Sequence, residues 1–272
     1  MIRLLATDLD GTLLQTGGSI SKENVAALAR AREAGFDVIF VTGRPPRWMS
    51  EILEMTGHPG LALCANGALT LDIATHEIVD ADLMDPDAGL EMALRLTDLD
   101  PNMSFAVELA LPHNDFVIDA TYRPRWETQT APVRMTLQEM FDTGKVVKLL
   151  ARPSEGLSMQ DADAFLHSAE HLAEGLCDIT HSDINDLMLE MSGIGINKGS
   201  GLAKIAASRG YSVDEVAAVG DMPNDIPMIK WAGRGFAVAN AHQWVKDVAT
   251  EVIDSNDSHG VGQLIDRLIA GN

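Results

Sequence analysis

Two carboxylates separated by a single leucine occur in the stretch LLATDLDGTLL, residues 4–14. If residues 4–9 form a strand, residues two apart point the same way, so Asp8 and Asp10 would lean toward one spot at its end. Like charges held that close repel, and a cation, a shared proton or a catalytic role must offset the repulsion. The alternative is a turn, because Asp, Gly and Thr often follow a strand and Asp10 or Thr12 could cap a helix.

Polar residues also follow other apolar stretches of the chain. The stretches VIFVTGR and VAAVGDMPND end on Thr42, Gly43, Arg44, Asp221, Asn224 and Asp225. The stretch GINKGSG places Lys198 just before an expected helix. A lysine at a helix start is opposed by the helix dipole, so a bound anion is the better explanation of that position.

These side chains fall into two chemical groups. The hard oxygen ligands, which suit Mg²⁺ rather than zinc, are Asp8, Asp10, Asp221 and Asp225. Thr42, Lys198 and the amides of the glycine turns are donors that suit phosphate oxygens. Together they indicate a phosphoryl group held between Mg²⁺ and a lysine. One acid would attack phosphorus to form an aspartyl-phosphate, and its neighbour would transfer the proton.

The elements that must position these residues alternate between strand and helix. Apolar stretches predict strands at residues 2–7, 37–43, 216–221 and 235–240. Helices are predicted at residues 21–35, 199–210, 226–233 and 260–271, the first with Ser21 as its N-cap and Gly35 at its end. This alternation predicts an α/β fold with an open parallel sheet and helices on both faces. Ligands bind beyond the carboxyl ends of the strands in such sheets.

The middle of the chain, residues 83–190, does not follow this alternation. It has more turn residues and aromatics, with strand-like pieces at residues 116–122, 146–151 and 187–191. We interpret it as an α+β domain inserted into a core made of residues 1–82 and 191–272. Arginines in this region could attract an anionic substrate tail, although a solvated face explains them better: Arg123, Arg125 and Arg134, near Trp126.

Charge and composition limit the function classes. The 272-residue chain is 46% hydrophobic, which is ordinary for a protein with a buried core, and its net charge of −20 argues against nucleic-acid binding. The two cysteines, Cys64 and Cys177, form no C-x-x-C pair, so we expect buried thiols rather than a disulfide framework or a zinc site. We find no signal-peptide pattern and no apolar run of membrane length, which predicts a cytoplasmic protein without a membrane partner.

Four motifs, DLDGTLL, VTGR, INKGSGL and GDMPNDIPM, resemble in this order the four motifs of the haloacid dehalogenase (HAD) superfamily. The D-x-D-G-T form is similar to that of its phosphatases, and the long insert between Thr42 and Lys198 is similar to the C2-type cap of its Cof-type hydrolases. The stretches CANGA, GFAVANA and DSHGVGQLI also look like that subfamily, although His259 stands where it often has Asp. The resemblance implies a Rossmann-like core and an α+β cap that selects the substrate.

The resemblance also implies roles for individual residues in the Mg²⁺-dependent hydrolysis of a phosphomonoester. Asp8 would be the nucleophile and Asp10 the acid and base, and the other expected catalytic residues are Thr42 and Lys198. The expected phosphate-binding residues are Leu9, Thr42, Gly43, Arg44, Lys198 and Asn224. The expected Mg²⁺ ligands are Asp8, Asp221 and the backbone carbonyl of Asp10, with Asp225 in support.

Several alternatives stay open at this point. Arg44 either reaches the substrate or pairs with an acid, and Asn224 either contacts phosphate or serves only its turn. A sugar phosphomutase would use the same fold but return the phosphoryl group to the sugar, and a non-catalytic binding protein would use the fold without its chemistry. We expect a monomer or homodimer whose partner is a small phosphorylated metabolite, such as a sugar phosphate or a cofactor phosphate.

Overall fold

The computed structural model describes residues 1–113, 115–124, 131–153, 159–180 and 187–271, so the expectation for Arg125 and Trp126 lies outside the described residues. The chain divides into two compact units, Met1–Asp80 with Asn197–Asn272, and Ala81–Ile196. Among the described residues, none of the helices combines the length and the apolar character needed to cross a membrane.

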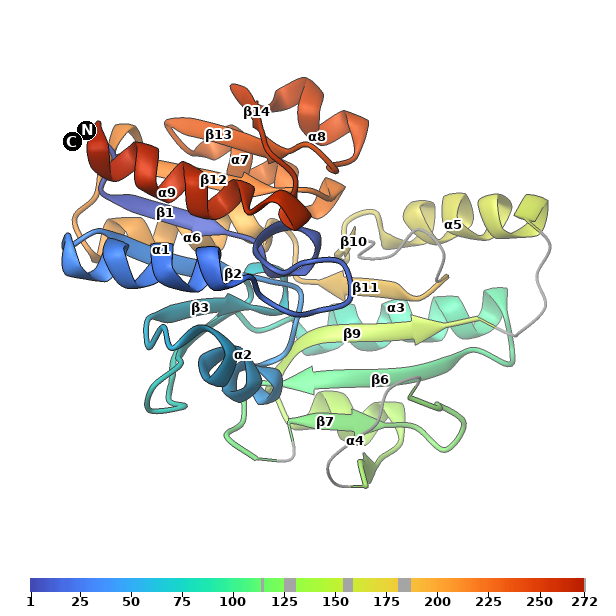
Figure 1. Ribbon diagram of the computed structural model, residues 1–272. Helices are drawn as coiled ribbons and strands as arrows, with labels where there is room; N and C mark the ends of the chain where they lie inside the picture. Colours follow the sequence, from blue (N-terminus) through green and yellow to red (C-terminus); the bar gives the residue numbers. More distant parts are fainter. Residues whose placement is uncertain (114, 125–130, 154–158, 181–186, 272) are drawn as a thin grey trace. The chain divides into compact units, whose positions relative to one another are not determined.

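The first unit is built on an eight-stranded sheet (Figure 1). Its strands lie in the order β14 (Glu251–Ile253), β13 (Arg234–Val238), β12 (Val216–Gly220), β1 (Leu4–Thr7), β2 (Asp37–Val41), β3 (Leu61–Cys64), β4 (Leu69–Asp72) and β5 (Ile78–Ala81). Neighbours from β14 to β3 pair in parallel, whereas β3 and β4 pair antiparallel. Leu4 lies opposite both Asp37 and Val216, so the three central strands end at nearly the same level. The predicted parallel α/β core is confirmed.

Helices cover both faces of this sheet. Helix α1 (Lys22–Glu33) packs beside α9 (Gly260–Ala270) on one face, and α6 (Lys198–Ser208) packs beside α7 (Ile226–Trp231) on the other (Figure 1). The unit also contains α2 (Met49–Thr56) and α8 (Gln243–Val248). The predicted cap of α1 is confirmed, because the Ser21 side chain accepts a hydrogen bond from the Asn24 amide, and Gly35 follows the helix with φ +67°.

The second unit contains a six-stranded sheet in the order β10 (Asp178–Thr180), β11 (Leu189–Ser192), β9 (Val146–Arg152), β6 (Ser104–Leu109), β7 (Phe116–Ile118) and β8 (Val133–Arg134). The pairings from β10 to β7 are antiparallel. One face of the sheet shares a buried apolar cluster with α3 (Pro86–Leu99), α4 (Leu137–Asp142) and α5 (Met159–Ala173), to which the strands contribute Val107, Leu149 and Met191. This arrangement is the α+β type predicted for the middle of the chain.

The opposite face of the second sheet carries buried charges. Lys148 of β9 lies opposite Glu108 of β6, and its Nζ donates a hydrogen bond of 2.6 Å to the Glu190 carboxylate of β11. All three side chains are almost completely buried. Charges removed from water are costly unless they are paired, and this row pairs opposite charges on neighbouring strands.

Candidate active site

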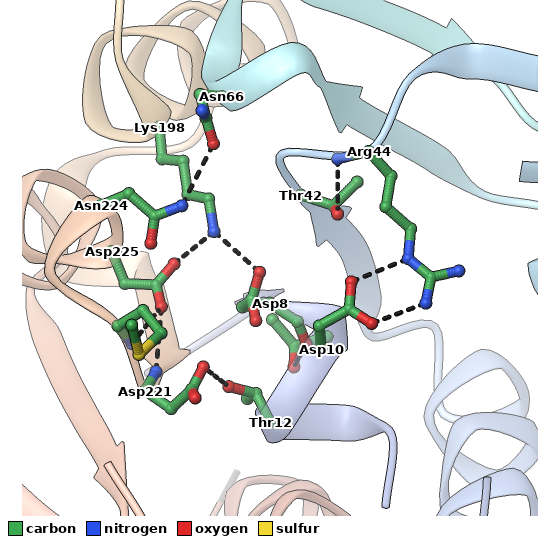
Figure 2. A network of polar contacts seen from close by, with 12 residues as sticks. Asp8, Asp10, Thr12, Thr42, Arg44, Asn66, Lys198, Asp221, Asn224 and Asp225 are labelled. Atoms are coloured by element: carbon green, nitrogen blue, oxygen red, sulfur yellow. Dashed lines mark hydrogen bonds and ion pairs between the residues drawn. The ribbon is translucent and has the colours of Figure 1, made fainter. Parts of the chain in front are cut away.

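The predicted site residues come from distant parts of the first unit and meet at the carboxyl edge of its sheet (Figure 2). Asp8 directly follows β1, Thr42 follows β2, and Asp221 follows β12. Lys198 begins α6, and Asp225 ends a short turn of helix after β12. Because parallel strands all end at one edge of the sheet, these loops converge although their residues are far apart in the chain.

Lys198 lies at the centre of the site. Its Nζ donates to Asp8 Oδ1 at 2.7 Å and to Asp225 Oδ1 at 2.5 Å, and the side chain is almost wholly buried. Asn197 is the N-cap, so the helix begins at Lys198 itself rather than one residue later as predicted. The two carboxylates compensate the unfavourable position of the lysine at a helix start.

The acids of the loop after β12 have different environments. Asp225 accepts from Lys198 through Oδ1 and from the amides of Asp221 and Met222 through Oδ2, at 2.9 and 3.0 Å. Its carboxylate therefore fixes the loop. Asp221 accepts from the Thr12 hydroxyl through Oδ1 at 3.0 Å, which connects this loop to the first motif.

Asp8 and Asp10 do not share one partner, so the predicted common orientation is only partly correct. Strand β1 ends at Thr7, and Asp10 lies in an irregular turn with ψ 122°, where the alternation of a strand no longer applies. Asp8 joins Lys198, while the Asp10 carboxylate accepts from Arg44 Nε and Nη2 at 2.7 and 2.6 Å (Figure 2). Of the two interpretations of Arg44, the structure shows the pair with an acid.

The loops after β2 and β3 contact each other beside this pair. The Thr42 hydroxyl accepts from the Arg44 amide at 3.1 Å, and the Thr42 carbonyl accepts from the Asn66 amide at 3.0 Å. Gly43 approaches so closely that an added Cβ would lie 3.0 Å from Asn66 Oδ1. That oxygen accepts from Asn224 Nδ2 at 3.2 Å (Figure 2). Leu9 is completely buried, so its side chain does not face a ligand.

Three polar residues that the motif chemistry did not single out also belong to these loops: Thr12, Asn66 and Asn240. Asn240 Nδ2 donates to the Gly11 carbonyl at 2.7 Å, and its Oδ1 accepts from the Asn256 amide at 3.0 Å. Position was the available signal, because Asn66 and Asn240 follow β3 and β13 at the same edge as the catalytic candidates.

The buried cluster has more negative than positive charge. Carboxylate oxygens of Asp8, Asp221 and Asp225 lie within 4.8 Å of one another, and Lys198 forms ion pairs with two of these acids, Asp8 and Asp225. Burial raises the pKa of Asp8 well above its ordinary value, and burial together with Asp225 raises the pKa of Asp221 to about 6. Burial alone would lower the pKa of Lys198, but Asp225 and Asp8 outweigh it and raise this pKa, so the lysine stays charged.

The donor set fits a small divalent cation. Buried carboxylates within reach of one another offer only oxygen, which is what Mg²⁺ binds. A bound cation would also allow all three acids to ionise, because it would compensate the charge that burial now opposes.

This fold and site define an α/β protein with a buried cluster of aspartates around a lysine at the carboxyl edge of its sheet. A model of the haloacid dehalogenase-like hydrolase family matches residues 5–265, and the chain therefore belongs to this family.

Curated relatives and solved structures agree with this assignment. The chain is 28% identical to pyridoxal phosphate phosphatase YbhA of Escherichia coli over 270 residues, which cover 97% of each protein. It is 30% identical to 5-amino-6-(5-phospho-D-ribitylamino)uracil phosphatase YwtE of Bacillus subtilis over 295 residues, 99% of each. The structure of a haloacid dehalogenase-like hydrolase from B. subtilis matches with a TM-score of 0.81 at 25% identity, covering 98% of this chain and 100% of that one. The chain is accordingly a phosphatase of the HAD superfamily, of the Cof type.

Proposed function

We propose that this chain hydrolyses a small phosphorylated metabolite in a Mg²⁺-dependent reaction that forms an aspartyl-phosphate on Asp8. The observation that carries the proposal is the buried contact of Lys198 with Asp8 and Asp225, beside Asp221. By their names, relatives act on pyridoxal phosphate and on 5-amino-6-(5-phospho-D-ribitylamino)uracil. A cofactor phosphate or a sugar phosphate is therefore the substrate class that we propose.

The first step breaks the bond between phosphorus and the leaving oxygen. Asp8 attacks phosphorus in line, and Asp10 gives its proton to the departing oxygen. Asp10 then takes a proton from water, whose oxygen attacks phosphorus, and the bond to Asp8 breaks to release inorganic phosphate. Lys198 and Thr42 would donate to the phosphoryl oxygens as charge moves onto them, together with backbone amides at Leu9 and Gly43.

Mg²⁺ would be held by Asp8, Asp221 and the backbone carbonyl of Asp10, while Asp225 keeps the loop in place. When bound, Mg²⁺ would neutralise the charge between the acids and the phosphoryl oxygens. We also propose that the second unit, Ala81–Ile196, acts as the cap that selects the leaving group, because every residue of the mechanism lies in the first unit.

The proposal is tested by measuring phosphate release from a panel of phosphometabolites that includes pyridoxal phosphate. We expect release from at least one ester with Mg²⁺, none after chelation with EDTA, and recovery when Mg²⁺ is added back. Isomer formation without phosphate release would instead indicate a mutase. Full activity in metal-free protein would overturn the Mg²⁺ requirement.

The variant Asp8→Asn tests the nucleophile separately. The amide keeps the shape of the side chain but cannot attack phosphorus, so turnover should be lost while the unfolding temperature changes little. Phosphate release within about tenfold of the parent would exclude Asp8 as the nucleophile.

A further inference from the structure

In the pair formed by Arg44 and Asp10, a single side chain donates to both oxygens of a carboxylate, whereas Lys198 donates to one oxygen each of Asp8 and Asp225. Arg44 Nε and Nη2 donate to Asp10 Oδ2 and Oδ1 at 2.7 and 2.6 Å (Figure 2). The Asp10 side chain is 57% exposed, whereas that of Arg44 is only 18% exposed. In the part of the chain that the structure describes, no other side chain hydrogen-bonds this carboxylate. Arg44 is thus the residue that determines its orientation.

Arg44 is itself held from three sides. Its amide donates to the Thr42 hydroxyl at 3.1 Å, and its carbonyl accepts from the Ala65 amide at 3.0 Å. Its guanidinium carbon lies 5.9 Å from the centre of the Trp48 ring, within the range of a cation–π contact. Asp10, in contrast, stands in the irregular turn that precedes Gly11. Arg44 is therefore the fixed residue of the pair, and its guanidinium determines the orientation of the Asp10 carboxylate.

A bidentate contact from a planar guanidinium fixes the plane of a carboxylate as well as its position. A proton donor needs that fixed direction, because a displacement of about 1 Å can cost about 10²-fold in rate. To carry the proton to the leaving group, one oxygen of Asp10 gives up its contact with Arg44, while the other oxygen stays bonded and keeps the carboxyl group beside the arginine.

On the basis of the proposed phosphatase function, we infer that Arg44 is a positioning residue that aims Asp10 at the leaving-group oxygen and acts on the reaction only through Asp10. Binding of the substrate anion by Arg44 is the competing role. The two roles predict different kinetics, because a residue that acts only through Asp10 has nothing left to do once Asp10 is disabled.

The test is a double-mutant cycle with Arg44→Ala, Asp10→Asn and the combined variant, measured at saturating Mg²⁺. We expect Arg44→Ala to lower kcat about 10- to 100-fold, with KM changed less than about threefold. In the Asp10→Asn background the same substitution should change kcat by less than about threefold. The loss from Arg44→Ala should be larger for an alkyl phosphate than for p-nitrophenyl phosphate, whose leaving group needs less protonation.

Two further variants act as controls. Arg44→Lys keeps the charge but not the two-point geometry, so it should recover only a minor part of the rate that Arg44→Ala loses. Arg47→Ala removes a neighbouring arginine that also lies over the Trp48 ring, at 5.6 Å, and kcat should stay within about threefold of the parent. Equal losses from Arg44→Ala in both backgrounds, or a loss mainly in KM, would overturn the inference. An active Asp8→Asn variant would instead refute the proposed function itself.

Discussion

At the scale of single residues, Gly11 shows how little space the site leaves around an acid. Its φ is +73°, and an added Cβ would lie 2.4 Å from Asp221 Oδ2. Asp221 cannot simply turn away, because its other oxygen accepts from Thr12. Glycine is therefore required twice, once for the backbone conformation and once for the approach to a proposed Mg²⁺ ligand.

The variant Gly11→Ala should therefore raise the Mg²⁺ concentration needed for half-maximal activity by about 10- to 100-fold, the usual effect of disturbing the surroundings of a metal ligand. Gly17→Ala is the matched control. Gly17 also has a positive φ, +99°, but an added Cβ would have no atom within 4 Å. Titrating both variants with Mg²⁺ separates backbone strain from the close approach to Asp221. Equal increases in the Mg²⁺ concentration for half-maximal activity would mean that backbone strain alone matters.

The raised pKa of Asp221, about 6 in the metal-free protein, predicts how Mg²⁺ binding depends on pH. An unfolded aspartate titrates near about 3.9, so the folded metal-free protein holds the extra proton and loses relative stability as pH rises from about 4 to about 6. Mg²⁺ must displace that proton at low pH but meets an ionised ligand above about pH 6. We expect Mg²⁺ to raise the unfolding temperature more at pH 7.5 than at pH 5. Asp221→Asn should reduce both the shift and its pH dependence, and a larger shift at pH 5 would contradict this account.

The chemistry of the site could be predicted from sequence better than its contacts. The motifs predicted which residues meet at the sheet edge, because acids and donors followed several strands that had to end together. They could not predict that Asp8 would contact Lys198, 190 positions away, or that Asp10 would contact Arg44. Those partners depend on where β1 ends and how its turn bends, which only the packed structure determines.

At the scale of elements, the start of α6 determines where Lys198 lies. The Asn197 side chain accepts from the amides of Gly199 and Ser200, both at 3.0 Å, and so caps the helix that begins at Lys198. The capping bond of α1 from Asn24 to Ser21 has similar geometry at 3.1 Å, but α1 carries none of the predicted site residues.

These two caps give a matched pair of variants. Asn197→Ala and Ser21→Ala should each lower the free energy of unfolding by about 0.5–2 kcal/mol. Only Asn197→Ala should also lower kcat, by about tenfold or more, because the first turn of α6 holds Lys198 beside Asp8. Chemical denaturation and steady-state kinetics on both variants provide the comparison. Unchanged kcat in Asn197→Ala, with the expected loss of stability, would show that Asp8 and Asp225 alone keep Lys198 in place.

The regular elements of the core could be predicted where local signals were strong. The helix at residues 21–35 had a cap at each end, and the structure places α1 at Lys22–Glu33 between those two signals. Elements such as β14, with three residues, and α8, with six, were not predicted. Elements this short carry little periodicity, although α7, also six residues long, was predicted from the stretch at residues 226–233.

At the scale of the whole molecule, the two units divide the charges between them. The first unit places three buried acids around Lys198, and the second pairs Lys148 with Glu190 on the face of its sheet opposite the helices. The α+β character of the inserted region could be predicted from its departure from strand–helix alternation. Its strand order could not, because antiparallel pairs such as β6 with β9 join residues far apart in the chain, for example Ser104 with Arg152, without a local signal.

If the second unit selects the substrate through the charged face of its sheet, Glu190→Gln should change which ester is preferred. The substitution removes the charge that pairs with Lys148 but keeps the shape of the side chain. It should cost about 1–3 kcal/mol of stability. We expect kcat/KM for the best metabolite ester to fall about tenfold relative to p-nitrophenyl phosphate, which offers the second unit little to recognise. The rate with p-nitrophenyl phosphate itself should stay within about threefold, because the phosphoryl chemistry lies in the first unit.

The next residue of the same strand provides the control for this prediction. Met191 points to the opposite face of the sheet, into the apolar cluster beneath α3, α4 and α5. Met191→Ala should cost more stability than Glu190→Gln, about 2–5 kcal/mol, because it leaves a cavity. It should nevertheless leave the ratio between the two esters unchanged, since it alters packing and not the charged face. Equal changes of that ratio in both variants would show that substrate preference follows stability. An equal loss of kcat/KM for both esters in Glu190→Gln would show that the second unit supports catalysis generally and does not choose the substrate.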